Sequence, residues 1–134
     1  MKVFLDTNVL ASALATRGLC AELFESVLTG HELLASDGLL AELRRILTIK
    51  LRIPADTVDA FLALIEANAT ILPTPAGFPA GIPDPDDAPL IAAALAGGAA
   101  CFVTGDKALL DLATVAGMPV ISPRRFWELT RAGR

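Results

Sequence analysis

The fold follows from one stretch near the start of the 134-residue chain, Val3-Phe4-Leu5-Asp6-Thr7-Asn8. Its three consecutive apolar residues predict a short strand over residues 2–6 that is buried on both faces, as strands are in parallel sheets covered by helices. Asp6 then stands at the carboxyl end of this strand. Binding sites in open parallel sheets form beyond these ends, where the strand order reverses. The stretch therefore predicts both a buried sheet and the edge at which a site forms.

The rest of the chain continues this alternation of strand and helix. Further strands are predicted at residues 32–35, 70–72, 101–104 and 119–121. Helices are predicted up to about residue 15 and over residues 20–28, 39–50, 56–68, 90–96, 107–116 and 123–131. Asp56 is a candidate N-cap, and the segment 73–89, which is rich in proline and glycine, is predicted to be a loop. This order predicts a single α/β domain over residues 1–134, with a mostly parallel sheet of five strands between helices.

The composition is that of a globular chain with a large core, because 54% of the residues are hydrophobic and only 19% are charged. The net charge of −4, from 15 acidic and 11 basic residues, by itself argues against a nucleic-acid partner. If four of the acids belong to one site, however, the remaining charges balance. A single acidic pocket repels phosphate only until it holds cations.

The sequence offers few ligands for zinc or haem. Its two cysteines, Cys20 and Cys101, lie far apart, and His31 is the single histidine. We expect the cysteines to be the reduced thiols of a cytoplasmic protein. The longest uncharged apolar stretch, residues 90–103, is too short to cross a bilayer, and the apolar start lacks a signal-peptide cleavage pattern. The prediction is a soluble protein with no membrane partner.

Acidic residues stand where predicted strands end or helices begin. Asp6 follows the first strand, Asp106 follows the fourth, and Asp87 closes the proline-rich loop before a helix. Each of these three is also explained as an N-cap, because an aspartate there satisfies unpaired backbone N–H groups. Glu42 lies at the edge of the apolar stripe of its predicted helix, where it either extends into solvent or turns into a pocket at the end of the sheet.

Four acids near one edge of a sheet pose an electrostatic problem. Unit charges about 4 Å apart interact by several kcal/mol at a protein-like dielectric. Such a cluster is sensible only if a cation neutralises it or if some carboxyls are protonated. Ligands that are all oxygen favour Mg²⁺ or Mn²⁺ over zinc. A metal held in this way can activate water, orient a phosphodiester and stabilise the leaving oxygen.

Four motifs carry a resemblance to a known family: LDTNVL at residues 5–10, LAEL at 40–43, DPDD at 84–87 leading into LIAAA at 90–94, and VTGD at 103–106. With these motifs the chain resembles the PIN (PilT N-terminus) domain family over essentially its whole length. Within the family, the chain resembles most closely the VapC-like toxins of type II toxin–antitoxin systems. The resemblance implies a three-layer α/β/α sandwich and an endoribonuclease that depends on Mg²⁺ or Mn²⁺. It also implies an RNA substrate, a small antitoxin protein as partner, and a homodimer.

The resemblance also implies roles for the four acids. Asp6 and Asp87 would be the principal metal ligands, and Asp106 and Glu42 would complete the acidic pocket, directly or through water. Water would attack an RNA phosphodiester in line and leave a 5′-phosphate and a 3′-hydroxyl. No histidine or lysine competes for the role of general base.

The same resemblance implies supporting or substrate-contacting roles for three neighbouring residues, Thr7, Asn8 and Thr104. The family aligns loosely in the proline-rich loop, so Asp84 and Asp86 are alternates for Asp87. Pro89 follows Asp87 more closely than the family motif leads one to expect, which could shift the start of the helix.

Basic residues cluster twice, and each patch either binds RNA phosphates or is a solvated helix surface. The two patches comprise Arg44, Arg45, Lys50 and Arg52, and Arg124, Arg125, Arg131 and Arg134. Beside the second patch, Phe126 and Trp127 either stack on a base or pack into the core or a partner subunit.

Two other functions fit parts of the pattern. An aspartyl phosphotransferase or receiver-like domain also places an aspartate at a strand end beside Mg²⁺. The haloacid dehalogenase pattern needs a second aspartate where this chain has Asn8, and a receiver needs a lysine that residues 119–123 lack. The other alternative is a non-catalytic PIN-like module that binds RNA or protein, although such a module gains nothing from acids that repel one another.

Overall fold

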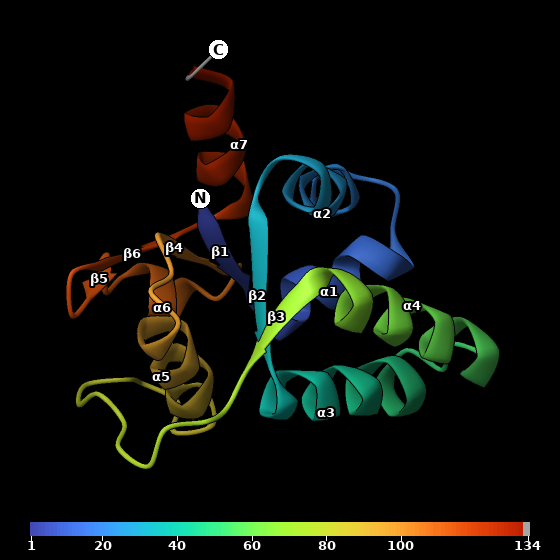
Figure 1. Cartoon of the computed structure of the whole chain (residues 1–134), viewed down its shortest axis with the longest axis horizontal. Coiled ribbons are helices and arrows are strands. Elements are labelled where there is room, and N and C mark those ends of the chain that lie inside the picture. Colours follow the sequence, from blue (N-terminus) through green and yellow to red (C-terminus); the bar gives the residue numbers. More distant parts are fainter. Residues whose placement is uncertain (133–134) are drawn as a thin grey trace.

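The computed structural model describes residues 1–132 and contains one six-stranded sheet between helices (Figure 1). The strands are β1 (Lys2–Leu5), β2 (Glu32–Ser36), β3 (Ala69–Leu72), β4 (Cys101–Val103), β5 (Thr114–Val115) and β6 (Met118–Ile121). Their order is β3-β2-β1-β4-β6-β5, and every neighbouring pair is parallel except β5 with β6. The predicted mostly parallel sheet is confirmed, with one short antiparallel strand added at an edge.

Helices cover both faces of this sheet. They are α1 (Thr7–Ala15), α2 (Leu19–Gly30), α3 (Asp37–Arg45), α4 (Ala55–Asn68), α5 (Ala88–Ala96), α6 (Lys107–Leu110) and α7 (Pro123–Ala132), with a π-helical turn, η1 (Ile46–Lys50), after α3. Figure 1 shows α1 to α4 on one side of the strands and α5 and α6 on the other, while α7 packs beside α2. The α/β/α sandwich is therefore confirmed. No helix among residues 1–132 is long and apolar enough to cross a membrane.

The core is built around β1 and β4, the two central strands. The three apolar residues of β1 are fully buried, and the ring of Phe4 stacks on that of Phe102 in β4, with centroids 5.3 Å apart. Burying a side chain of this size stabilises the fold by about 1.5–3 kcal/mol. The parallel register continues past the strands, since Asp6 N donates to Val103 O at 2.8 Å. The carboxyl ends of β1 and β4 are thereby fixed side by side.

The predicted helix over residues 107–116 is wrong beyond its first turn. Helix α6 ends at Leu110, and the chain then forms a hairpin of β5 and β6. Ala113 and Ala116 adopt positive φ angles of 61° and 49°, and Gly117 one of 83°, which a right-handed helix cannot contain. The segment instead forms part of a hairpin at the edge of the sheet, so the sheet has six strands rather than the five predicted.

Two smaller differences concern α3 and α4. The predicted helix over residues 39–50 begins at Asp37, where the Ser36 hydroxyl caps it by accepting from Leu39 N at 3.1 Å, and it changes to a π turn at Ile46. Asp56 is not an N-cap, because α4 begins after Pro54 without a side-chain cap and Asp56 lies within its first turn.

Candidate functional site

The candidate site lies where the order of the strands reverses. From β1 the sheet extends to β2 and β3 in one direction and to β4 and β6 in the other, so the switch point lies between β1 and β4. Crevices at the carboxyl ends of strands at such a point are the usual ligand sites of open α/β sheets. Asp6 directly follows β1, and Thr104 directly follows β4.

Asp6 is buried, with 4% of its surface exposed, and both of its carboxylate oxygens have partners. Oδ1 accepts from Thr7 N at 2.8 Å, and Oδ2 accepts from the Thr104 hydroxyl at 2.7 Å. Burial raises the pKa of Asp6, the two hydrogen bonds lower it, and the charge of Asp106 raises it further, with a net rise. Asp6 is therefore a rigidly oriented carboxyl group whose negative charge is unfavourable unless a cation lies near it.

Thr104 connects two of the candidate acids. It is fully buried, and its Oγ1 donates to Asp6 and accepts from Asp106 N at 3.1 Å. Asp106 itself is exposed, and its Oδ1 caps α6 by accepting from Ala108 N at 2.9 Å. The capping explanation thus holds for Asp6 and Asp106 alike, and it does not exclude a second role, because each carboxylate has two oxygens.

Asp87 has no capping role, although it precedes α5, because its side chain makes no cap hydrogen bond. It is half-buried, and burial is the main cause that raises its pKa to about 7. Four neighbouring acids raise it further by their negative charge, and these are Asp6, Asp84, Asp106 and Glu42. Pro89 lies in the first turn of α5 and does not shift the helix, which begins directly after Asp87, at Ala88.

The two alternate loop acids are more exposed than Asp87. Asp84 and Asp86 both lie at the surface, and Asp84 Oδ1 accepts from Asp86 N at 2.9 Å, which closes a tight turn. Asp87 N also donates to Asp84 O at 3.0 Å. The turn thus leaves Asp87 as the most enclosed of the three acids.

Glu42 is half-buried on α3 and belongs to the same electrostatic group. Burial raises its pKa first, and the negative charge of Asp6 raises it next. The Thr7 side chain and the positive charge of Arg45 lower it, while Asp86 raises it, with a net rise. The charge of Asp6 thus acts on Glu42, although the two acids belong to different elements of the fold.

The polar neighbours of Asp6 differ in their surroundings. Thr7 is 1% exposed, and its hydroxyl oxygen has no partner within hydrogen-bond distance among residues 1–132, although it lies near enough to Glu42 to lower the pKa of that carboxyl group. A buried hydroxyl without a partner costs about 1–3 kcal/mol, and such atoms in native proteins often mark the place of a water or an ion. Asn8 is exposed at the next position.

The chemistry of this donor set fits a hard divalent cation. Every candidate ligand is an oxygen, which favours Mg²⁺ or Mn²⁺, and an unpartnered hydroxyl lies among them. Within the described part of the chain, however, no three carboxylate, imidazole or thiol groups converge into a preformed metal group. Repulsion between like charges opposes a closer approach of these carboxylates when no cation is bound. Asp6 is the member of the group that two hydrogen bonds hold in place.

The two aromatic residues beside the second basic patch differ in their burial. Phe126 is buried in the core, so it does not stack on a base. Trp127 is half-buried, and the guanidinium of Arg131 lies 3.9 Å from its ring centroid. Arg134 lies outside the described residues.

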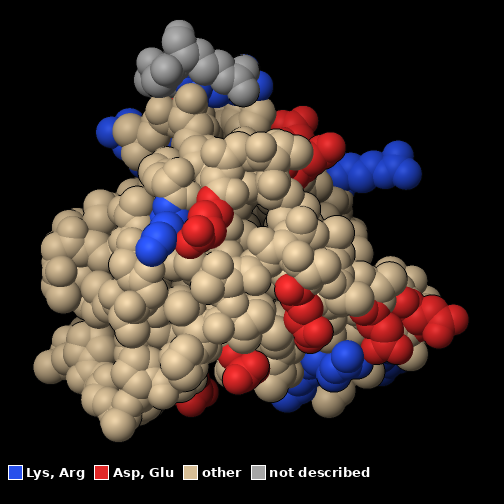
Figure 2. All heavy atoms as spheres, in the orientation of Figure 1, with Lys and Arg blue, Asp and Glu red and all other residues tan. Residues whose placement is uncertain are grey.

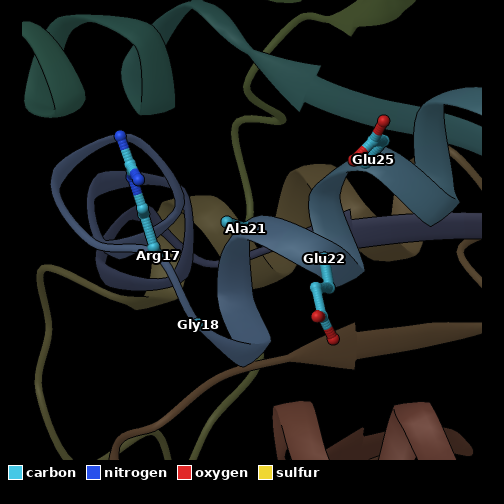
Figure 3. A pocket seen from close by; sticks show the side chains of 5 residues that line it. All are labelled: Arg17, Gly18, Ala21, Glu22 and Glu25. Carbon is cyan, nitrogen blue, oxygen red and sulfur yellow. The ribbon is translucent and has the colours of Figure 1, made fainter.

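A surface hollow and His31 lie apart from the candidate acids, and neither includes a predicted catalytic residue. A hollow of about 230 Å³ lies at the junction of α1 and α2 (Figure 3), lined by Arg17, Gly18, Ala21, Glu22 and Glu25. His31 lies at the start of β2, with Nδ1 3.4 Å from the terminal nitrogen of Met1. It thus precedes the amino end of β2, whereas Asp6 follows the carboxyl end of the parallel neighbour β1.

Comparisons with known proteins agree with this geometry. A family model described as PIN domain matches residues 2–108. No curated protein sequence matches the chain. Among solved structures, the chain is similar to VapBC2 from Rickettsia felis bound to a DNA fragment from their promoter, with a TM-score of 0.64 and 16% identity over 91% of this chain and 98% of that chain. At this level of identity the likeness shows a shared fold.

Proposed function

The chain belongs to the PIN domain family, a family of nuclease domains, and we propose that it is a metal-dependent endoribonuclease, the toxin of a toxin–antitoxin pair. One observation carries this proposal. The pKa values of Asp6, Glu42 and Asp87 are all raised, and each of these acids is affected by others of the group at the switch point of the sheet. A protein gains no stability from such repulsion, so the group is best explained by a cation that it binds.

Asp6 and Asp87 are the proposed principal ligands of Mg²⁺ or Mn²⁺, with Asp106 and Glu42 completing the site directly or through water. When bound, such an ion stabilises negative charge on a phosphodiester and lowers the pKa of a neighbouring water. Asp87 is preferred to Asp84 and Asp86 because it is more enclosed and its side chain makes no cap hydrogen bond.

The surrounding residues orient these groups. Thr104 and the backbone of Thr7 hold the Asp6 carboxylate in one orientation, which reduces the entropy that binding would otherwise cost. Glu42, on which the charge of Asp6 acts, is the proposed group that orients the attacking water and accepts its proton at a carboxylate oxygen. In-line attack would form a P–O bond from the water and break the P–O3′ bond, and the leaving 3′ oxygen would take a proton from solvent, which gives a 5′-phosphate and a 3′-hydroxyl.

The proposal includes partners and location. The structural neighbour was solved as a complex bound to promoter DNA, and this supports a small antitoxin protein as a partner of the present chain. A homodimer and a cytoplasmic location complete the proposal. A non-catalytic module that binds RNA or protein is the alternative.

The test is cleavage of labelled single-stranded RNA by the purified chain in Mg²⁺ or Mn²⁺, with and without EDTA. Asp6→Asn and Asp87→Asn should each abolish cleavage. Glu66→Gln, which removes an exposed acid of α4, is the matched control and should cleave like the unmodified chain. RNA binding without cleavage in any metal, or full activity of both aspartate variants, would contradict the proposal.

A further inference from the structure

A groove of about 370 Å³ lies between α3, η1 and the start of α4. Its lining residues are Ala41, Arg44, Arg45, Thr48, Ile49 and Ala55. The volume falls in the range of about 300–1,000 Å³ that is typical of small-ligand pockets. Arg45 lines the groove and follows Glu42 by three residues on α3, so these two side chains are neighbours on the helix surface and Arg45 connects the groove with the proposed catalytic carboxylate.

The π turn shapes the apolar part of this groove. Leu51 N donates to Ile46 O at 3.0 Å, five residues back, which widens the helix at this point. Ile49 is left 67% exposed at the wall of the groove. Single π turns often occur at functional sites, and this one presents an apolar side chain beside Arg44 and Arg45.

The two arginines of the groove differ in their electrostatic state. Arg44 Nη1 forms an ion pair with Asp59 Oδ1 at 2.8 Å, so its charge is largely neutralised. Arg45 is exposed and has no ion pair among residues 1–132, and its charge acts on Glu42. In Figure 2, basic side chains gather along the lower edge, in the region that α3 occupies in Figure 1, with acidic side chains on either side.

We propose that this groove binds one nucleotide of single-stranded RNA next to the scissile bond, with Arg45 on a backbone phosphate and the base packed against Ile49. This inference rests on the proposed nuclease function and names a substrate subsite for it. RNA must approach a site whose other charges are negative, and an unpaired arginine at its edge supplies the attraction. A guanidinium suits phosphate because it donates two parallel hydrogen bonds.

The apolar wall favours a single strand over a duplex. A base has two apolar faces, and single-stranded RNA can turn a base out to pack on a side chain, whereas a helical duplex keeps its bases stacked. An acidic protein segment with apolar side chains would also be complementary to Ile49 and the arginines of the groove. The closeness of Arg45 to Glu42 favours RNA, because a phosphate bound at Arg45 leads directly to the acidic site.

The first measurement is the affinity of a short labelled single-stranded RNA for the full chain, by fluorescence anisotropy in EDTA at several salt concentrations. Arg45→Ala should weaken binding by roughly tenfold and reduce the salt slope by about 0.7, the value for one phosphate contact on a single strand. Arg17→Ala is the matched control, because Arg17 is an exposed basic residue away from the groove, at the junction of α1 and α2, and its loss should leave the salt slope unchanged.

The second measurement isolates the base contact. Ile49→Ser should weaken binding of the RNA and leave unchanged the binding of the same strand with an abasic position at the subsite. Both side chains are exposed, so the variants should fold, and circular dichroism checks this. Equal RNA affinity of Arg45→Ala, Ile49→Ser and the unmodified chain would contradict the subsite and leave the groove to a protein segment. Absence of RNA binding by the unmodified chain would also contradict it.

The same variants are then assayed for cleavage in Mg²⁺. Chelator-sensitive cleavage with unchanged RNA affinity in Arg45→Ala and Ile49→Ser would contradict the subsite alone. The expected pattern of affinities without any cleavage would contradict the nuclease function and support the subsite. The two proposals therefore fail in different ways.

Discussion

The Thr104 hydroxyl donates a hydrogen bond of 2.7 Å to Asp6 Oδ2, across a sequence separation of 98 residues. Both groups are buried, and each directly follows one of the two central strands. The parallel register of β1 and β4 brings them together. The hydrogen bond therefore fixes one carboxylate of the candidate site independently of any bound cation.

Replacing Thr104 by valine should weaken both the site and the fold. The change removes the donor to Asp6 and the acceptor for Asp106 N. Hydrogen bonds to charged groups contribute about 1.5–3 kcal/mol, and loss of a group that orients a metal ligand typically costs about 10–100-fold in metal affinity or activity. Urea unfolding and the Mg²⁺ dependence of cleavage measure the two effects. Thr104→Ser keeps the hydroxyl and should retain most of both, so equal losses in the two variants would show that the hydroxyl is not the cause.

Mg²⁺ or Mn²⁺ should raise the melting temperature of the protein. A ligand that binds only the folded chain stabilises it by an amount that grows with its concentration, about 2.7 kcal/mol at a concentration 100 times its Kd. Asp6→Asn and Asp87→Asn should lose most of this gain, whereas Glu66→Gln should keep it. The measurement is differential scanning fluorimetry over a metal titration. An equal gain for all four proteins would place the bound metal elsewhere.

The stability of the metal-free protein should fall as the pH rises. Burial raises the pKa values of Asp6, Glu42 and Asp87, the last to about 7, so the folded chain binds protons more tightly than the unfolded chain. This contribution to stability is present below the ordinary carboxyl pKa of about 4 and is lost as the pH rises through the raised values. In EDTA the melting temperature should therefore be lower at about pH 8 than at about pH 5, and Asp87→Asn should flatten the change. A rise over this interval would contradict the account.

Replacing Glu42 by glutamine should reduce cleavage more than it reduces metal binding. Glu42 lies on α3, outside the fixed pair of Asp6 and Thr104, and its proposed action is on the attacking water. Loss of a group that transfers a proton typically costs about 10²–10⁴-fold in rate. We expect a lower kcat with little change in the Mg²⁺ concentration that gives half-maximal activity. An unchanged kcat would remove Glu42 from the reaction.

Elements with strong local patterns were predictable from the sequence. The apolar run of β1 and the serine cap of α3 each contain the signal for their structure in a few adjacent residues. The hairpin after Leu110 was not predictable, because its apolar spacing also suits a helix and the positive φ angles of Ala113 and Ala116 carry no signal in an alanine. Tertiary pairing with β6 decides that segment.

The candidate site was predictable as a set of residues but not as an arrangement. The three aspartates could be found from their places at a strand end or helix start, and Glu42 from its place at the edge of an apolar helix stripe. The sequence does not show how the side chains of these acids are arranged in space. Nor does it show the turn that leaves Asp87 more enclosed than Asp84, or the π turn that exposes Ile49. These depend on contacts between segments that are distant in the chain.

The most direct test of the central claim is a crystal structure of the protein soaked in Mn²⁺, with anomalous diffraction to locate the ion. We predict an anomalous peak coordinated by carboxylate oxygens of Asp6 and Asp87, with the Asp87 side chain rotated toward Asp6 and the hydrogen bond from Thr104 to Asp6 kept. A peak at another group of residues, or no peak between these two aspartates at saturating Mn²⁺, would contradict the account.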